Sequence, residues 1–363
     1  MIESIDVSVY TIPTDTPESD GTLEWDSTTI VVVEPTAGGV RGLGYSYADA
    51  SAGRLIVDKL GPLVVGRDAF DIAMTWQALV ASVRNIGRPG IAATAISALD
   101  NGLWDLKARL LGVSVADLIG RARDRIPAYG SGGFCSYDDR QLFDQLGSWA
   151  GAGFPFVKMK VARAPATDDH RITVARRAIG DAVRLFVDAN GAHDRVAALA
   201  AQQMYAEHDV TWLEEPVSSD DITGLRSIRE RAPAGMAIAA GEYGWDPFNL
   251  RRLIDGRAVD VIQADATRCL GTTGFGVVAA LAEASHTPLS AHCAPALHVQ
   301  LTCAARSAIH LEWFHDHVRV ERLLFDGSPE PVAGMVAPDL ARPGLGLELK
   351  RRDGEPYLIW SSR

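Results

Sequence analysis

The amino-acid sequence predicts an α/β fold in which helices surround a closed barrel of parallel strands and a smaller domain is added. From Ile126 onward, short apolar runs alternate with helical stretches over about 200 residues, which is typical of such barrels. Charged residues stand at the ends of the apolar runs, where α/β barrels place their chemistry. The length of 363 residues leaves room for a second domain beside the barrel.

The composition is that of an ordinary soluble protein, with 22% charged and 47% hydrophobic residues. A net charge of −11 argues against a nucleic-acid partner and against binding to an anionic membrane. The acidic start MIESIDVSVYTIPTD is unlike a signal peptide, and no run approaches the roughly 18 apolar residues of a membrane span. The four cysteines show no CxxC spacing, so we expect reduced thiols in a cytoplasmic protein.

Residues 1–48 predict antiparallel strands. The runs IDVSVYTI and TTIVVVEP alternate as strands do, and AGGVRGLGYSYA adds a glycine-rich turn and a third strand. The segment TDTPESDGTLEWD at 14–26 lies between the first two runs and is polar, acidic and rich in turn residues. We expect a loop there, and its residues alone leave open whether it is a solvated connection or a functional loop.

Residues 68–112 predict helices. In IAATAISALDNGLWDLKARLLG the apolar residues recur at three- and four-residue steps, and Gly112 suits a helix end. We therefore expect residues 1–122 to form an α+β domain of their own.

Eight apolar runs predict the strands of the barrel, which we expect to occupy residues 123–322. They are IPAYGS, FPFVKMKV, RLFVDAN, VTWLEEP, MAIAAGE, VDVIQAD, TPLSAH and IHLEW. The last segment, 323–363, breaks this rhythm with Gly and Pro, and we expect it to return to the first domain.

Charged side chains end seven consecutive strands of this predicted barrel. They are Lys158 and Lys160, Asp188 followed by Asn190, Glu214 and Glu215, Glu242, Asp265, His292, and Glu312. Residues two apart on a strand share a face, so Lys158 and Lys160 point together. An unpaired charge in a barrel mouth is costly, and packing alone therefore does not explain the set.

Three of these acids predict a metal site. Asp188, Glu214 and Glu242 would repel one another on adjacent strands unless a cation lies among them. Each acid could instead pair with a neighbouring Lys or Arg, but for the three together we favour one metal ion. Hard oxygen donors without cysteine select Mg²⁺ over zinc or copper.

Acid/base groups would flank that site. Asp265 would fix the tautomer of His292 and leave its other nitrogen free to move protons, although a lone histidine is more often a hydrogen-bonded core residue. Lys158 and a nearby metal would lower the pKa of Lys160 and make it usable as a base. Abstraction of a proton next to a carboxylate needs this arrangement, because metal and cationic groups stabilise the ene-diolate.

With these residues in place, the chain resembles the enolase superfamily, in its mandelate racemase subgroup, over nearly its whole length. The resemblance rests on an ordered set of motifs, each weak alone. The set comprises ALDNGLWDLKARLLG at 98–112, the KMK pair, VDAN at 187–190, WLEEP at 212–216, GE at 241–242, Asp265, His292, LEW at 311–313 and PGLG at 343–346.

The resemblance implies a (β/α)7β barrel, a modified TIM barrel, under an α+β capping domain formed by the N-terminal segment and the C-terminal tail. It implies one Mg²⁺ per subunit on Asp188, Glu214 and Glu242, while Glu215 would stand outside the ligand set. The family is often oligomeric, commonly octameric, so a homo-oligomer is implied as well.

The resemblance also implies roles around the substrate. Lys160 and the His292–Asp265 dyad would be the acid/base pair. Lys158 and Glu312 would contact the substrate carboxylate, and Asn190 would contact a substrate oxygen. The segment 14–26 would be a flexible cap that closes on the substrate, with Trp25 and Tyr47 as candidate wall residues.

Two departures narrow the reaction. Strand six ends in QADATRC without a lysine, unlike the muconate-cycloisomerase and dipeptide-epimerase branch, and Tyr243 rather than His follows GE. The remaining members are mandelate racemase and dehydratases of acid sugars, which the catalytic residues do not separate. Because the acids and hydroxyls of 14–26 suit a polyhydroxylated substrate, we expect dehydration of an aldonate or aldarate to a 2-keto-3-deoxy acid. A racemase or epimerase of a 2-hydroxy acid is the second interpretation, and a cycloisomerase is a weaker one.

Two other classes of protein are less well supported. A catalytically inactive barrel that serves as a binding protein predicts a vacant catalytic position, and none is vacant. A metal-dependent hydrolase needs a histidine pair, which His310, His315 and His317 offer only superficially, since the last two lie past the strand end. The loop GTTGFG at 271–276 is weak evidence for phosphate binding.

Overall fold

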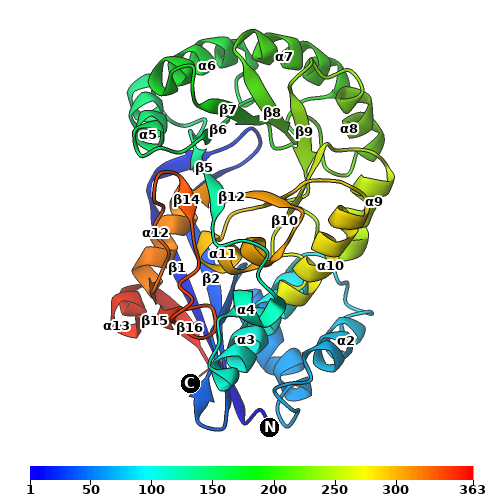
Figure 1. Ribbon diagram of the computed structural model, residues 1–363, viewed down its shortest axis with the longest axis vertical. Helices are drawn as coiled ribbons and strands as arrows, with labels where there is room; N and C mark the ends of the chain where they lie inside the picture. The colour runs from blue at the N-terminus through cyan, green and yellow to red at the C-terminus, as the bar shows by residue number, and fades with distance from the viewer. Residues whose placement is uncertain (363) are drawn as a thin grey trace.

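The computed structural model describes residues 1–362 and contains the eight parallel strands that the sequence predicts. These are β5 (Ile126–Gly132), β6 (Phe156–Lys160), β7 (Arg184–Asp188), β8 (Val210–Glu214), β9 (Ala237–Ala240), β10 (Val261–Ala264), β11 (Leu289–Ala291) and β12 (Ala308–Phe314). Because β12 pairs with β5, the sheet closes into a barrel (Figure 1). The predicted barrel with an N-terminal antiparallel sheet beside it is confirmed.

Helices follow the strands and cover the outside of the barrel. They are α5 (Asp139–Gly151), α6 (Pro165–Ile179), α7 (Arg195–Glu207), α8 (Ile222–Arg229), α9 (Pro247–Asp255), α10 (Gly271–Ala284), α11 (Pro295–Ala304) and α12 (His315–Leu324). Several begin at an aspartate whose carboxylate accepts a backbone N–H of the first turn, as Asp138, Asp194 and Asp246 do. None of the helices in residues 1–362 has both the length and the apolar character needed to cross a membrane.

The N-terminal region forms an antiparallel sheet backed by helices. Its strands are β1 (Ser4–Ser19), β2 (Glu24–Ala37), β3 (Val40–Arg41) and β4 (Gly44–Tyr47). Its helices are α1 (Ser51–Leu55), a π-helical turn at Ile56–Leu60, a 3-10 turn at Gly61–Leu63, α2 (Ile72–Ser82), α3 (Ile91–Leu111) and α4 (Val115–Ile119). Gly112 ends α3 in the left-handed conformation, as predicted. One face of the sheet packs with the helices in a hydrophobic cluster of its own, while residues of the other face, such as Tyr10 and Ile30, join the hydrophobic core of the barrel.

The C-terminal segment reaches both parts of the molecule. It contains β13 (Phe325–Asp326), β14 (Met335–Val336), β15 (Glu348–Leu349), α13 (Arg351–Gly354), a 3-10 turn at Glu355–Tyr357 and β16 (Leu358–Ser361). β14 pairs with the barrel strand β5, and β16 pairs with β1 at the edge of the N-terminal sheet. The two ends of the chain therefore share one sheet, and Figure 1 shows the termini close together.

The segment 14–26 is not the loop that its composition predicts. β1 and β2 continue through it as a long hairpin, interrupted between Pro13 and Glu18 and paired again at Glu18–Trp25. The prediction failed because a tight turn closes the hairpin: the Asp20 carboxylate accepts the backbone N–H groups of Thr22 and Leu23 at 2.6 and 2.7 Å. In Figure 1 the hairpin extends from the N-terminal sheet to the barrel.

The tip of this hairpin is seated on the barrel loops. The backbone N–H of Cys135, after β5, donates to the carbonyl of Ser19 at 2.7 Å. Gly21 lies so close to the loop after β7 that a Cβ there would stand 2.6 Å from the carbonyl oxygen of Ala189. A side chain at position 21 therefore has no room, and the tip contacts the loop that follows Asp188.

Polar side chains of α3 join the N-terminal region to the barrel. The Asn101 amide donates to the carbonyls of Tyr45 in β4 and Ala266 after β10, at 3.3 and 3.0 Å. Its carbonyl oxygen accepts the backbone N–H and the hydroxyl of Thr272, at 2.8 and 3.0 Å. One fully buried amide thus fixes β4 and the loop beside Asp265 to the same helix.

We expect Asn101→Ala to destabilise the protein by at least about 2 kcal/mol, because it leaves buried backbone groups of Ala266 and Thr272 without partners. Urea or thermal denaturation measures this loss. The control is Asn85→Ala, which removes an exposed amide and should change stability by less than about 0.5 kcal/mol. Equal effects of the two substitutions would contradict the proposed bridging role of Asn101.

Candidate active site

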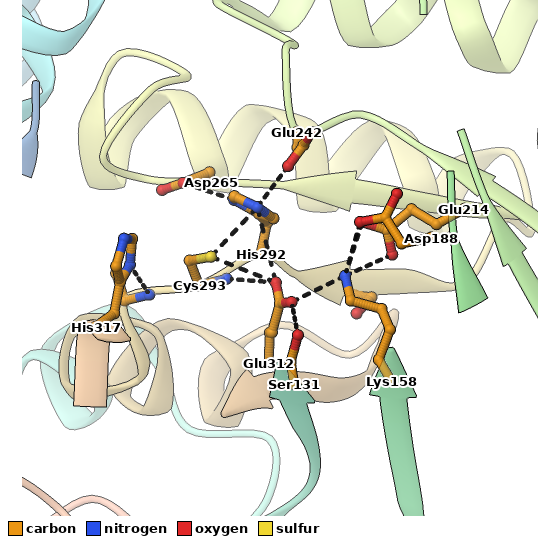
Figure 2. Close-up of polar contacts among 12 residues, drawn as sticks. Ser131, Lys158, Asp188, Glu214, Glu242, Asp265, His292, Cys293, Glu312 and His317 are labelled. Atoms are coloured by element: carbon orange, nitrogen blue, oxygen red, sulfur yellow. Dashed lines mark hydrogen bonds and ion pairs between the residues drawn. The ribbon is translucent and has the colours of Figure 1, made fainter. Parts of the chain in front are cut away.

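Strand register brings the predicted strand-end side chains to one end of the barrel. In the parallel ladder Lys160 lies beside Asp188, and Asp188 beside Glu214. All of the predicted site residues are buried, and Figure 2 shows most of them pointing toward one another. The set comprises Lys158, Lys160, Asp188, Asn190, Glu214, Glu242, Asp265, His292 and Glu312.

The backbone turns sharply just past several of these strand ends. Asn190, Glu215, Cys293 and Ala294 all have positive φ angles, of 45°, 38°, 52° and 41°. Asparagine tolerates this left-handed region, but the others adopt it at a cost. Such strain concentrates where the surrounding structure holds functional side chains in place.

Lys158 is a buried cation between two carboxylates. Its Nζ lies 2.8 Å from both carboxylate oxygens of Glu214 and 2.8 Å from Oε1 of Glu312. Ser131 donates to the same Oε1 at 2.5 Å. Burial by itself disfavours the ammonium, but Glu214 and Glu312 outweigh it, so the pKa of Lys158 is raised well above its usual value. Lys158 is therefore charged and holds Glu312 in position.

Lys160 is paired with Asp188, from its Nζ to Oδ2 at 2.5 Å. Burial favours the neutral amine, but the Asp188 carboxylate more than offsets that, and the pKa of Lys160 is raised. The protein groups alone therefore raise the pKa of Lys160, whereas the sequence predicts a lowered pKa. The difference arises because Asp188 lies closer to Lys160 than the sequence reveals.

Asp265 and His292 form the predicted dyad. Oδ2 of Asp265 lies 2.9 Å from Nδ1 of His292, while Nε2 faces Glu242 Oε2 at 2.7 Å. Burial disfavours the charged forms of both side chains. The contact with His292 nevertheless lowers the pKa of Asp265, and neighbouring acids, Glu312 and Glu242 among them, raise the pKa of His292. The Asp265 contact orients the ring and leaves Nε2 turned to the mouth.

A cavity of about 690 Å³ opens beside the carboxylates. Asn190 and Glu215 line it, and each has a buried side-chain oxygen, Oδ1 and Oε1, without a hydrogen-bond partner among the described residues. Its other polar lining comes from hydroxyl and amide side chains, including Thr22 at the hairpin tip, and from the charged side chains of Asp220 and Arg252. The cavity therefore offers polar groups next to the strand ends.

The site contains an arginine that the sequence analysis did not single out. Arg268 lies 3.7 Å from Asp265 and 3.9 Å from Glu242, and its guanidinium stacks over the ring of Tyr243. It stands three residues after Asp265, a spacing that places both side chains on the same side of a helical turn. That spacing could have revealed Arg268 from the sequence, but the motif QADATRC was interpreted only through its missing lysine.

The features that favoured other classes of protein do not assemble into sites. His310 points into the barrel interior and contacts Ser290, His315 pairs with Asp15 of the hairpin, and His317 stacks on Tyr47. At the loop 271–276, the first N–H groups of α10 are already bonded to Ser97, Asn101 and Asp100 of α3. Neither a histidine metal pair nor a free phosphate site is present in these described segments.

The two candidate wall residues, Tyr47 and Trp25, make different contacts near the barrel mouth. Tyr47 is buried against His317, with ring centroids 3.4 Å apart. Trp25 packs edge-on against Phe134 and donates its Nε1–H to Glu18 at 2.9 Å. The tryptophan therefore belongs to the hairpin surface that faces the barrel loops.

Comparison with known proteins agrees with this geometry. Residues 5–120 match the family model described as the mandelate racemase / muconate lactonizing enzyme N-terminal domain, and residues 141–353 match the enolase C-terminal domain-like model. The chain belongs to the mandelate racemase subgroup of the enolase superfamily.

Solved structures are similar to the whole chain in fold, and a curated protein is similar to it in sequence over nearly the same length. A mandelate racemase/muconate lactonizing enzyme-like protein from Rubrobacter xylanophilus is 52% identical, with a TM-score of 0.97 and 99% of each chain covered. L-talarate/galactarate dehydratase from Salmonella typhimurium LT2, liganded with Mg and L-lyxarohydroxamate, is 29% identical, with a TM-score of 0.90 and 99% and 93% covered. The 3,6-anhydro-alpha-L-galactonate cycloisomerase of Streptomyces coelicolor is 31% identical over 96% of this chain and 97% of its own.

The donor chemistry of the site fits the magnesium ion bound in such relatives. Carboxyl groups outnumber the lysine and arginine cations in the mouth. The carboxyl groups are Asp188, Glu214, Glu215, Glu242, Asp265 and Glu312, and the cations are Lys158, Lys160 and Arg268. Burial and the neighbouring acid Asp188 raise the pKa of Glu214 to about 7. The excess of carboxylates over cations is therefore costly without a further cation. Hard oxygen donors with surplus negative charge suit Mg²⁺.

Glu18, at the hairpin tip, should make stability depend on pH. Burial, and then the nearby Asp316, raises its pKa from 4.5 to about 8. The folded state therefore binds this proton more tightly than the unfolded state, and stability should fall as pH rises from about 4.5 to about 8. We expect Glu18→Gln to remove this part of the decline, which denaturation midpoints measured from pH 5 to 9 detect.

The control for this prediction is Glu24→Gln on the same hairpin, where the carboxylate is exposed. It should leave the pH dependence of the wild type unchanged. A Glu18→Gln variant whose stability falls with pH as steeply as that of the wild type would contradict the prediction.

Proposed function

We propose that this chain catalyses the Mg²⁺-dependent dehydration of an acid sugar, an aldonate or aldarate, to a 2-keto-3-deoxy acid. The observation that carries the proposal is the placement of Lys160 at the end of β6 and of His292 and Asp265 just after β11 and β10, with Glu214 at the end of the intervening β8. In the strand order, the lysine thus lies to one side of Glu214 and the His292–Asp265 pair to the other. The similarity to L-talarate/galactarate dehydratase supports the same reaction class.

In this proposal Asp188, Glu214 and Glu242 hold one Mg²⁺. A bound magnesium ion would stabilise the negative charge that develops on the substrate carboxylate when its α-proton is removed. Lys158 is held as a cation by two carboxylates and would bind the same carboxylate together with Glu312. Asn190, with an unpaired Oδ1 and an amide that donates to Glu242 at 3.1 Å, would contact a substrate oxygen.

The acid/base chemistry falls to Lys160 and His292. One of them removes the proton next to the carboxylate, and the resulting ene-diolate expels the β-hydroxyl as water with a proton from the other. The enol then takes up a proton on carbon and loses one from its oxygen to give the keto acid, so the substrate loses one molecule of water in all. Asp265 keeps the His292 ring oriented with Nε2 toward the substrate space.

The cavity beside the metal ligands favours a polyhydroxylated substrate. Its lining includes the hydroxyl groups of Thr22, Ser218 and Ser219 and the amide of Asn249. These groups can form hydrogen bonds with the hydroxyl groups of a sugar chain, which a substrate with an apolar ring lacks. This is a second, independent support for an acid-sugar substrate.

An isomerase is the second candidate. Lys160 and His292 would also serve racemisation or epimerisation of a 2-hydroxy acid, in which the second group returns the proton from the opposite face. The similarity to a cycloisomerase over 96% of the chain favours this class specifically.

A screen of aldonates and aldarates with the purified protein tests the proposal. We expect a keto product from one or a few acid sugars in the presence of Mg²⁺, loss of that activity with EDTA, and its recovery on adding Mg²⁺ back. Replacement of the α-proton by deuterium in D₂O, with inversion and without loss of water, would instead establish the isomerase. Product formation that is insensitive to EDTA would contradict the metal-dependent mechanism.

We expect Lys160→Met and His292→Asn each to lower kcat by about 10²–10⁴-fold, the usual contribution of a general acid or base. The matched controls are Lys59→Met and His286→Asn, which replace exposed residues of the same types and should keep wild-type activity. Circular dichroism checks that the variants are folded. Wild-type-like turnover in either site variant would remove that residue from the mechanism.

A further inference from the structure

Three buried side chains at the ends of β11 and β12 face one another in a way that the proposed dehydration does not use. His292 Nε2 lies 3.3 Å from Cys293 Sγ and 3.8 Å from Glu312 Oε2, and the sulfur lies 3.5 Å from the same oxygen. Figure 2 shows the thiol between the imidazole and the carboxylate. Among the described residues, this is the one group of three or more His, Cys, Asp and Glu side chains whose ligand atoms all lie within 4.8 Å of one another.

These distances match one face of a tetrahedral zinc site. With ordinary Zn–N, Zn–S and Zn–O bond lengths, the ligand atoms of a tetrahedron stand about 3.4–3.6 Å apart. The observed separations of 3.3, 3.5 and 3.8 Å lie close to those edges. Imidazole nitrogen and thiolate sulfur favour Zn²⁺ over Mg²⁺.

The surroundings of two of these groups are also those of metal ligands. The other ring nitrogen of His292 contacts Asp265 at 2.9 Å, the carboxylate–histidine pairing that commonly orients a zinc-binding imidazole. The other oxygen of Glu312 is held by Ser131 and Lys158, which leaves Oε2 toward the thiol. Both ligands are therefore oriented before any ion arrives.

We propose that His292, Cys293 and Glu312 form a second metal site that takes Zn²⁺, separate from the proposed magnesium site. Binding replaces the thiol proton and the proton on Nε2 of His292, both of which pass to the solvent, so that a thiolate and a carboxylate balance the charge of the ion and a neutral imidazole completes the three ligands. Nε2 of His292 must exchange its contact with Glu242 for the zinc ion. If His292 acts in the proposed dehydration, bound zinc stops turnover, because Nε2 no longer transfers protons.

The test uses Co²⁺ as a spectroscopic substitute for Zn²⁺, in the presence of saturating Mg²⁺ and reducing agent. Cobalt bound to a thiolate gives a sulfur-to-cobalt charge-transfer absorption that oxygen and nitrogen ligands do not give. We expect this absorption to saturate at one Co²⁺ per chain and to disappear when Zn²⁺ is added. Cys293→Ser and Cys293→Ala should both lack it, and Cys135→Ser, which alters a half-buried thiol elsewhere, should retain it.

The outcomes separate this proposal from the proposed reaction. No sulfur-to-cobalt absorption in the wild type, an absorption that survives in both Cys293 variants, or one lost in Cys135→Ser would overturn the zinc site. His292→Asn should weaken cobalt binding by more than the roughly 10–100-fold that loss of an outer partner costs. Because the readout is absorption and not turnover, a failed sugar screen leaves it intact, and its own failure leaves the dehydration proposal standing.

Discussion

The structure depends on the balance of charge in a buried barrel mouth. Carboxylates from consecutive strands enter a space from which water is largely excluded, and each would be costly there alone. Lys158 and Lys160 neutralise part of this charge from the neighbouring strand, and His292 and Arg268 do so from the other side. The remaining negative charge suits a divalent cation such as the magnesium bound in related structures, so the same electrostatic condition bears on both the folding cost and the proposed metal site.

The capping region contributes to this mouth through position more than through chemistry. Asn101 of α3 ties the loop beside Asp265 to β4, and Asp100 and Ser97 hold the start of α10. The Asp265 loop is therefore fixed from outside the barrel by a helix that precedes it in sequence by more than a hundred residues. The buried contacts of α3 therefore restrict the movement of the loop that carries the Asp265 carboxylate.

The sequence predicted the elements of this protein better than their contacts. All eight strands and the end of α3 at Gly112 follow from apolar periodicity and glycine punctuation, which are local properties. The carboxylates of the site could be predicted from their positions at the strand ends alone, because the ends of parallel strands meet at one side of a barrel. The pairing of Lys160 with Asp188, which raises the pKa of the lysine instead of lowering it, depends on the distance between two segments that are separated in the chain. The same is true of the contact between the thiol of Cys293 and the carboxylate of Glu312. The left-handed turns at Glu215 and Cys293 are held by the surrounding structure. The hairpin at 14–26 is instead closed by a local turn at Asp20, which the polar composition alone did not distinguish from a loop.

The contact of Gly21 with the loop after β7 has a consequence for how the mouth meets solvent. Since no Cβ fits between the hairpin tip and Ala189, the two backbones lie in direct contact at that point. Thr22, the next residue of the tip, lines the cavity beside the strand ends together with Asn190. The absence of a side chain at position 21 therefore lets one short turn both rest on the barrel and form part of the cavity wall.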